Sequence, residues 1–207
     1  MNPSTGSEPE DPGPDSFDAF VFANRGALLA LPAVVLAAVG KPSAFSIATG
    51  LPLAFAGEVV RMWAVGYSGP TTRGDTVTAP ALVTAGPYAY VRNPLYAGNV
   101  VTAAGFAIAF TGKNSAAVRL ALVAGSLAAM IGVYAVIVPH EEGYLRATFG
   151  PAFEAYCARV PRVVPALEPS DPQHGTYDPA VIGKAESRTW LTFTAMLGVL
   201  ALKALRA

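Results

Sequence analysis

Long apolar stretches constrain the fold of this chain more than any other feature. Residues 21–39, 44–67, 94–110 and 116–138 are apolar over most of their length, and a shorter apolar stretch covers residues 190–205. A helix needs roughly 20 such residues to cross a bilayer. The chain is 53% hydrophobic and only 14% charged, with a mean hydropathy of +0.42, which is too apolar for an ordinary soluble domain. We therefore predict an all-α, polytopic membrane helix bundle with about five transmembrane helices.

The remaining segments divide into a tail and a set of polar loops. Residues 1–18 are rich in Pro, Gly, Ser, Asp and Glu, so we expect a disordered acidic tail followed by a single membrane domain over residues 19–207. The first residues lack Lys and Arg, so no secretory signal is expected. Most Lys and Arg residues outside the apolar stretches fall in residues 68–93 and 139–186, which by the positive-inside rule are cytoplasmic. The balance of 14 Lys and Arg against 14 Asp and Glu gives no indication of a nucleic-acid partner.

Residues 84–98 form the most unusual polar stretch in the chain. Pro87 and Pro94 each disfavour helix just before themselves, so a shaped loop is expected over residues 86–93. Asn93 is expected to be an N-cap and Pro94 the first residue of a helix. An interfacial turn with an aromatic belt would account for any one of these residues. It accounts poorly for their density, which favours a ligand site containing Tyr88, Tyr90, Arg92 and Tyr96.

A second polar segment begins where the fourth apolar stretch ends. Glu141, Leu145 and Phe149 share one helical face, and Gly150 and Pro151 are expected to end that helix and start another. We expect two cytoplasmic amphipathic helices here, at the membrane interface. Glu141 and Glu142 have two open interpretations: first-turn acids that stabilise a helix N-terminus, or groups that hold a ligand's cation or hydroxyls.

A pair of charges lies near the cytoplasmic end of the second apolar stretch. Glu58 and Arg61 are three residues apart and so lie on one helical face. Charged side chains in a membrane indicate function, although a local ion pair with a snorkelling Arg61 is an alternative. No metal site is predicted, because His140 has no partner at ligand spacing and Cys157 is the single cysteine.

Two of these segments together resemble a known family. Residues 83–98 (VTAGPYAYVRNPLYAG) and residues 141–162 (EEGYLRATFGPAFEAYCARVPR) resemble the two signatures of the isoprenylcysteine carboxyl methyltransferase / phospholipid methyltransferase family. Residues 57–64 (GEVVRMWA) are a weaker third element. The resemblance covers about residues 57–162, and residues 187–206 would be an extra C-terminal helix outside it.

The resemblance implies a function. Members of this family are integral membrane enzymes that use S-adenosylmethionine, release S-adenosylhomocysteine and act on a membrane lipid or a lipidated substrate. It implies a bacterial inner-membrane enzyme with its active site facing the cytoplasm. The implied cofactor-binding residues are Gly86, Tyr88, Arg92, Asn93, Pro94, Tyr96, Gly98, Glu141, Glu142 and Tyr156, and the implied catalytic residues are Arg92, Glu142 and Arg61.

The methyl acceptor stays open at this point. Asn93 stands where the carboxyl methyltransferases have histidine, and Phe153 replaces a usual tyrosine. A carboxylate acceptor would need a cation such as Arg61 or Arg92, whereas an amine acceptor would need Glu141 or Glu142 as a base. The alternative functions are a sterol-reductase-like oxidoreductase that uses NADPH and a non-enzymatic membrane scaffold. The sequence gives no oligomeric state.

Overall fold

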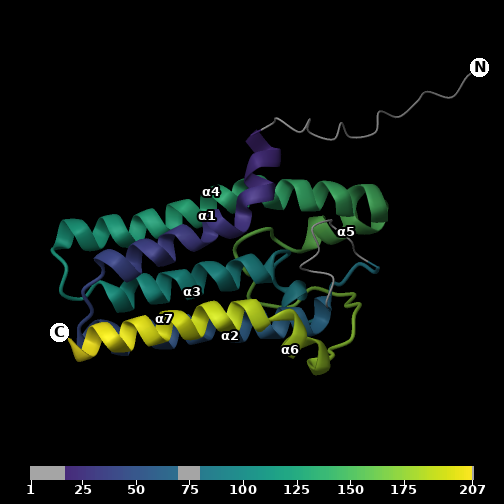
Figure 1. Ribbon diagram of the computed structural model, residues 1–207. Coiled ribbons are helices and arrows are strands. Elements are labelled where there is room, and N and C mark those ends of the chain that lie inside the picture. The colour runs from purple at the N-terminus through teal and green to yellow at the C-terminus, as the bar shows by residue number, and fades with distance from the viewer. Residues whose placement is uncertain (1–16, 70–79, 207) are drawn as a thin grey trace, which may run out of the picture.

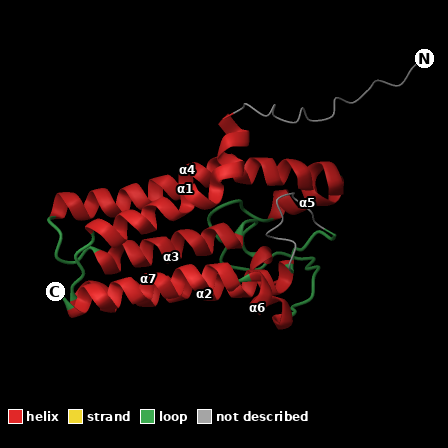
Figure 2. Ribbon diagram, in the orientation of Figure 1, coloured by secondary structure: helices red, strands yellow, loops and turns green. Residues whose placement is uncertain are grey.

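The computed structural model describes residues 17–69 and 80–206, and within these ranges the regular structure is entirely helical (Figures 1 and 2). The prediction of an all-α fold is confirmed. The helices are α1 (Phe17–Val39), α2 (Ala44–Ser68), α3 (Pro94–Phe110), α4 (Ala116–Phe149), α5 (Pro151–Arg159), α6 (Ile182–Ala185) and α7 (Ser187–Leu205). Two short 3₁₀ helices cover Gly86–Ala89 and Pro179–Val181.

The long helices run side by side as a bundle. α1 packs against α4, α2 packs against α3, and α3 also contacts α4 and α7 (Figure 1). At one end α4 extends beyond its neighbours and leads into α5, with α6 nearby, while the C-terminus lies at the opposite end. The first signature, in the loop before α3, and the second signature, in the end of α4 and in α5, therefore gather at the α5–α6 end of the bundle (Figure 1).

The contact between α2 and α3 is made by glycines. A Cβ atom on Gly57 would lie 2.5 Å from the Thr102 nitrogen and 2.6 Å from the Gly98 oxygen. A Cβ atom on Gly105 would lie 2.3 Å from the Ala54 nitrogen. Small residues of this kind let helix backbones approach closely, as in membrane helix pairs. The pair α2–α3 therefore forms a close-packed unit that carries the first signature.

Prolines mark a helix boundary at one of two places where the sequence analysis expects one. α3 covers the predicted residues 94–110, with Pro94 at its start. The prediction of a separate amphipathic helix after the apolar stretch 116–138 was wrong, because α4 continues through Pro139 to Phe149. A proline removes one backbone donor, and membrane helices tolerate this where neighbouring groups compensate. Glu141 and Glu142 are consequently not first-turn acids, which removes one of their two interpretations.

The two ends of the chain can be compared with the expected limits of the membrane domain. α1 includes Phe17, two residues before the expected start at residue 19, and residues 1–16 of the expected tail lie outside the described part of the chain. α7 covers Ser187–Leu205, in agreement with the extra C-terminal helix expected over residues 187–206, and the short helix α6 precedes it. α5 and the break at Gly150 agree with the prediction.

By length and composition, α4 is the one helix among the described residues that is long and apolar enough to cross a membrane. Residues 24–39 of α1 and residues 94–110 of α3 form shorter apolar helices. About five membrane spans therefore stay a prediction.

Candidate functional site

One glycine and the segment of residues 166–174 fix the conformation of the first signature. Gly86 has φ +62°, a conformation that favours glycine, and a Cβ atom there would lie 2.2 Å from the Tyr67 ring. The Thr84 nitrogen donates to the His174 carbonyl at 2.8 Å, and the Ala166 nitrogen donates to the Tyr90 carbonyl at 2.9 Å. Residues 166–174 thus bind the backbone of the signature loop from outside.

Arg92 joins the two signatures through Glu142. The Arg92 Nε donates to Glu142 Oε1 at 2.9 Å, and the Arg162 Nη2 donates to Glu142 Oε2 at 2.5 Å. Arg92 Nη1 also donates to the carbonyl oxygens of Cys157 and Val160, at 3.0 and 3.1 Å. This set, Arg92, Glu142 and Arg162, is the Arg92 cluster. Its buried carboxylate is held by two guanidinium groups, an arrangement that also fixes the end of α5.

Asn93 occupies the N-cap position of α3, but its side chain makes no capping hydrogen bond. The predicted N-cap position is therefore confirmed, but the capping hydrogen bond expected of an asparagine there is absent. Its Nδ2 instead donates to Glu142 Oε1 at 3.4 Å and to the Arg162 carbonyl at 3.2 Å. The Asn93 side chain therefore contacts the second signature, because both acceptors belong to residues 141–162.

Glu141 and Glu142 are neighbours with different surroundings, beyond the apolar stretch of α4. Burial raises the pKa of the Glu141 carboxyl, and the hydrogen bond from Tyr96, at 2.6 Å, offsets only part of that increase. Burial also raises the pKa of Glu142, but hydrogen bonds from Arg162 and the charge of Arg92 lower it by more, so it lies below its ordinary value. Glu141 is therefore the better proton acceptor of the two.

Aromatic side chains line the same region. The Tyr156 hydroxyl donates to the Tyr88 carbonyl at 2.8 Å, which joins α5 to the first signature. Burial raises the pKa of Tyr88 to about 12. Tyr96 packs against Tyr134 with ring centroids 4.4 Å apart, and Asn99 Nδ2 donates to the Tyr134 hydroxyl at 2.7 Å. These phenols stay protonated near neutral pH and can donate hydrogen bonds.

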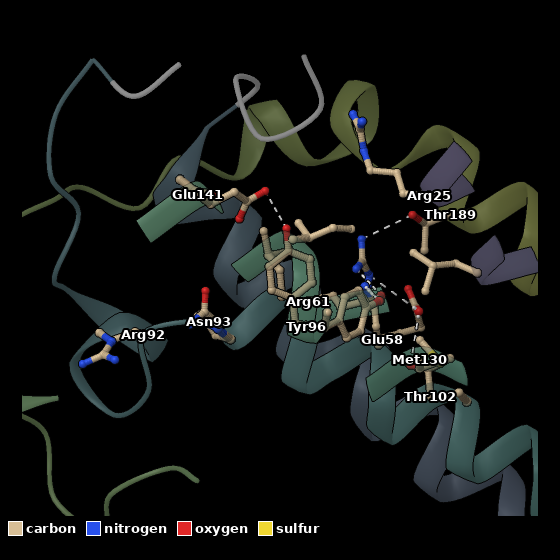
Figure 3. Close-up of a pocket in the computed structure, with 18 of the residues that line it drawn as sticks. Arg25, Glu58, Arg61, Arg92, Asn93, Tyr96, Thr102, Met130, Glu141 and Thr189 are labelled. Carbon is tan, nitrogen blue, oxygen red and sulfur yellow. Dashed lines mark hydrogen bonds and ion pairs between the residues drawn. The ribbon is translucent and has the colours of Figure 1, made fainter. Parts of the chain in front are cut away.

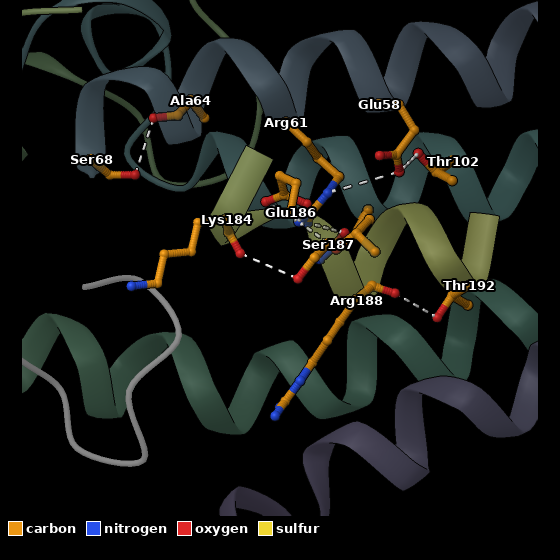
Figure 4. Close-up of polar contacts among 12 residues, drawn as sticks. Glu58, Arg61, Ala64, Ser68, Thr102, Lys184, Glu186, Ser187, Arg188 and Thr192 are labelled. Carbon is orange, nitrogen blue, oxygen red and sulfur yellow. Dashed lines mark hydrogen bonds and ion pairs between the residues drawn. The ribbon is translucent and has the colours of Figure 1, made fainter. Parts of the chain in front are cut away.

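A second charged group lies deeper in the bundle, around Arg61 (Figure 4). Arg61 Nη2 donates to both carboxylate oxygens of Glu186, at 2.9 and 2.8 Å, and to Thr189 Oγ1 at 3.3 Å. Arg61 Nη1 donates to Asn99 Oδ1, and its Nε lies 3.8 Å from Glu58 Oε1. We call these five residues the Arg61 cluster. The predicted Glu58–Arg61 pair is present, but the guanidinium is buried and directed at Glu186, so the snorkelling alternative was wrong.

One cavity of about 1020 Å³ connects the two charged groups (Figure 3). Figure 3 shows Arg92 and Asn93 at one end, Tyr96 and Arg61 in the middle, and Met130 towards the other end. We distinguish a polar compartment, lined by Tyr88, Arg92, Asn93, Glu141, Glu142 and Tyr156. It continues into an apolar compartment, lined by Leu29, Ala33, Leu36, Phe106, Met130, Ile137, Phe193 and Met196.

The cavity brings together most of the residues predicted from the sequence. Beyond those of the polar compartment, Arg61, Pro94 and Tyr96 also line it. Gly86 and Gly98 do not line it, since Gly86 shapes the loop and Gly98 packs against Arg61 and Gly57. Among the described residues, no group of three or more His, Cys, Asp or Glu side chains is arranged to hold a metal ion.

The sequence analysis missed the residues that complete both charged groups. The sequence indicates Arg162 only as the last residue of a signature, yet its guanidinium donates a hydrogen bond to Glu142. Glu186 is not singled out by any pattern in the sequence, yet its side chain is only 1% exposed and pairs with Arg61. A lone acid just before a terminal apolar helix was the available signal, and nothing in the spacing indicated its partner 125 residues earlier.

Comparison with known families confirms the resemblance found in the sequence. The chain matches the sequence model for phospholipid methyltransferase over residues 45–152, which includes the whole first signature and the start of the second. Comparison with curated proteins and with solved structures gives no match. The match covers just over half of the chain. The chain therefore belongs to the phospholipid methyltransferase family, a family of membrane-associated methyltransferases that act on lipids.

Proposed function

We propose that this protein is an integral membrane methyltransferase that transfers a methyl group from S-adenosylmethionine to a lipid or lipid-like acceptor. The observation that carries the proposal is the continuity of the cavity. Its polar compartment is built from both signatures, and the apolar side chains of α1, α3, α4 and α7 line the same cavity. Such a cavity suits a polar cofactor and a hydrocarbon chain that must meet.

The chemistry of the polar compartment fits the proposed cofactor. Bound S-adenosylmethionine would supply a methyl group activated by a positively charged sulfonium. Glu141 supplies a carboxylate for a cationic group, Asn93 supplies an amide, and the Tyr88 and Tyr96 rings supply faces on which an adenine or a cation can rest. The expected cofactor contacts are therefore Tyr88, Asn93, Tyr96, Glu141 and Tyr156.

Arg92 and Arg61 already donate hydrogen bonds to groups of the protein itself. Arg92 donates to Glu142 and to two carbonyl groups, and Arg61 donates to Asn99, Glu186 and Thr189. Both guanidinium charges face carboxylates of the protein itself. We propose that they organise the cavity, and that Glu141 is the group placed to accept a proton from an amine acceptor.

A carboxylate acceptor is the second candidate, and Arg188 favours it. Arg188 lines the cavity and extends away from the Arg61 cluster at the start of α7 (Figure 4). A cation there can hold an acidic head group while the acceptor oxygen takes the methyl group without a base.

Binding of the cofactor is tested by calorimetry on detergent-purified protein. S-adenosylmethionine and S-adenosylhomocysteine should both bind saturably, and NADPH should not. Tyr88→Ala and Glu141→Ala should each weaken binding by about tenfold or more, the equivalent of roughly 1.4 kcal/mol. The matched controls are Tyr144→Ala and Glu154→Ala, since neither side chain lines the cavity. Saturable NADPH binding without binding of the methionine-derived pair would overturn the proposal in favour of a reductase.

A further inference from the structure

The helix α7 lies outside the family match, yet it supplies one wall of the cavity. Arg188, Thr189, Thr192, Phe193 and Met196 line the cavity and recur at spacings of three and four residues, so they share one helical face. The outer side of the helix is exposed at positions such as Leu191 and Ala195. The wall is therefore a defined face of α7 and not the whole helix.

The start of this wall is fastened to the family core. Glu186 immediately precedes α7, is fully buried and pairs with Arg61 of α2. Thr189, in the first turn of α7, accepts a further hydrogen bond from the same guanidinium group. The Arg61 cluster therefore sets where α7 begins relative to the cavity.

The wall changes from polar to apolar along its length. Thr189 contacts the Arg61 cluster, whereas Phe193 and Met196 are buried in the main apolar core. The Phe193 ring lies 5.0 Å from the Phe106 ring and 5.1 Å from the Phe55 ring, centroid to centroid, in edge-to-face contacts. Met196 extends the same surface further from the polar compartment, so these two side chains bound the apolar end of the cavity.

The dimensions of the cavity leave room for a chain. Both Pro94 and Phe106 line it, and a helical rise of 1.5 Å per residue separates them by roughly 18 Å along α3. Phe106, Phe193 and Met196 offer no hydrogen bonds to a polar cofactor, whereas burial against them stabilises hydrocarbon.

We propose that the inner face of α7 holds the apolar chain of the methyl acceptor, and that Phe193 and Met196 determine how long a chain the cavity accepts. The proposal rests on the proposed function, because it identifies the occupant as part of the acceptor. It assigns acceptor selection to the C-terminal helix and leaves the cofactor to the two signatures.

The experiment compares Met196→Trp with Ala195→Trp. The first places a larger ring at the apolar end of the cavity, and the second places the same ring on the exposed side of the same helix. The probes are lysophosphatidylcholine with a short lauroyl chain and with a long oleoyl chain, measured by native mass spectrometry. The head group of these probes carries a quaternary ammonium and takes no further methyl, so binding is measured without turnover.

Wild-type protein and Ala195→Trp should bind both probes. In Met196→Trp, the affinity for the oleoyl probe relative to the lauroyl probe should fall about tenfold, which corresponds to about 1.4 kcal/mol. The reason is that the larger side chain leaves too little space for the longer chain. Met196→Ala should shift the ratio the other way, which keeps the test valid if the tryptophan variant fails to fold. An unchanged ratio in a folded variant, or no binding of either probe to wild type, would overturn the inference.

Titration with S-adenosylmethionine on the same samples separates this inference from the proposed function. Both Met196 variants should bind the cofactor as wild type does, because Met196 lies outside the polar compartment. If the Met196 variants change the chain preference but wild-type protein does not bind S-adenosylmethionine, the inference about α7 stands and the proposed methyl transfer is contradicted.

Discussion

The two sides of the cavity are built in different ways. On one side, α2 and α3 meet backbone to backbone, since Gly50, Gly57, Gly98 and Gly105 each leave no space for a Cβ atom. On the other side, α7 meets its neighbours through large side chains such as Phe193 and leaves the cavity between them.

This contrast assigns different tasks to the two sides of the cavity. Backbone contact leaves no freedom for α2 to move against α3, so the first signature and Arg61 are held in one register. Contacts made by the tips of large side chains can change by substitution without moving a helix. The glycine-packed side is therefore suited to place the reacting groups, and the α7 side is suited to adapt to an acceptor.

The largest expected effect comes from separating α2 and α3. Gly105→Leu should lower the free energy of unfolding by about 3 kcal/mol or more, because its side chain would overlap the backbone of Ala54 and Gly50. Thermal unfolding in detergent measures the loss. Gly132→Leu on α4 is the control, since a Cβ atom there meets nothing within 4 Å, and it should be neutral or slightly stabilising. Equal effects of the two changes would contradict the account of the close-packed side.

The next effect comes from releasing α7 from the core. Glu186→Ala should cost about 3 kcal/mol, because it leaves the buried Arg61 with only the more distant carboxylate of Glu58. The control is Glu154→Ala, which breaks a half-exposed pair with Arg146 and should cost less than about 1 kcal/mol. Denaturant titration of the two variants measures the difference. If Glu186→Ala were as mild as its control, α7 would not be fastened as described.

A smaller and more diagnostic effect is expected at Asn93. Asn93→Asp should destabilise the protein by about 1–2 kcal/mol and by more than Asn93→Ala, because a carboxylate oxygen would face the acceptors Glu142 Oε1 and the Arg162 carbonyl. A capping role predicts the reverse order, since aspartate is a good N-cap and alanine is a poor one. Thermal unfolding of both variants therefore decides between the two roles.

The sequence predicted the parts of this structure that depend on local chemistry. Pro94 marked the start of α3, and Gly150 with Pro151 marked the junction of α4 and α5, because these residues restrict the backbone wherever they occur. The same reasoning failed at Pro139, where the surrounding helix tolerates a missing donor. Local rules do not report how well neighbouring groups compensate.

The candidate site was predictable where residues come from the signatures and not where they come from elsewhere. Tyr88, Arg92, Glu141 and Glu142 are indicated by the two signatures, and all four line the cavity. Glu186 pairs with Arg61 across 125 residues, and no periodicity links an acid just before α7 to an arginine in the distant helix α2. Its role depends on the tertiary fold alone.

The most direct test of the central claim follows the methyl group itself. Protein reconstituted into vesicles of a bacterial lipid extract would be incubated with S-adenosylmethionine labelled in its methyl group, and lipid-soluble label would be measured after extraction. We expect label in a lipid for wild type and for Glu154→Ala, and little or none for Tyr88→Ala and Glu141→Ala. Absence of lipid-soluble label from folded wild-type protein, or equal labelling by all four proteins, would contradict the account.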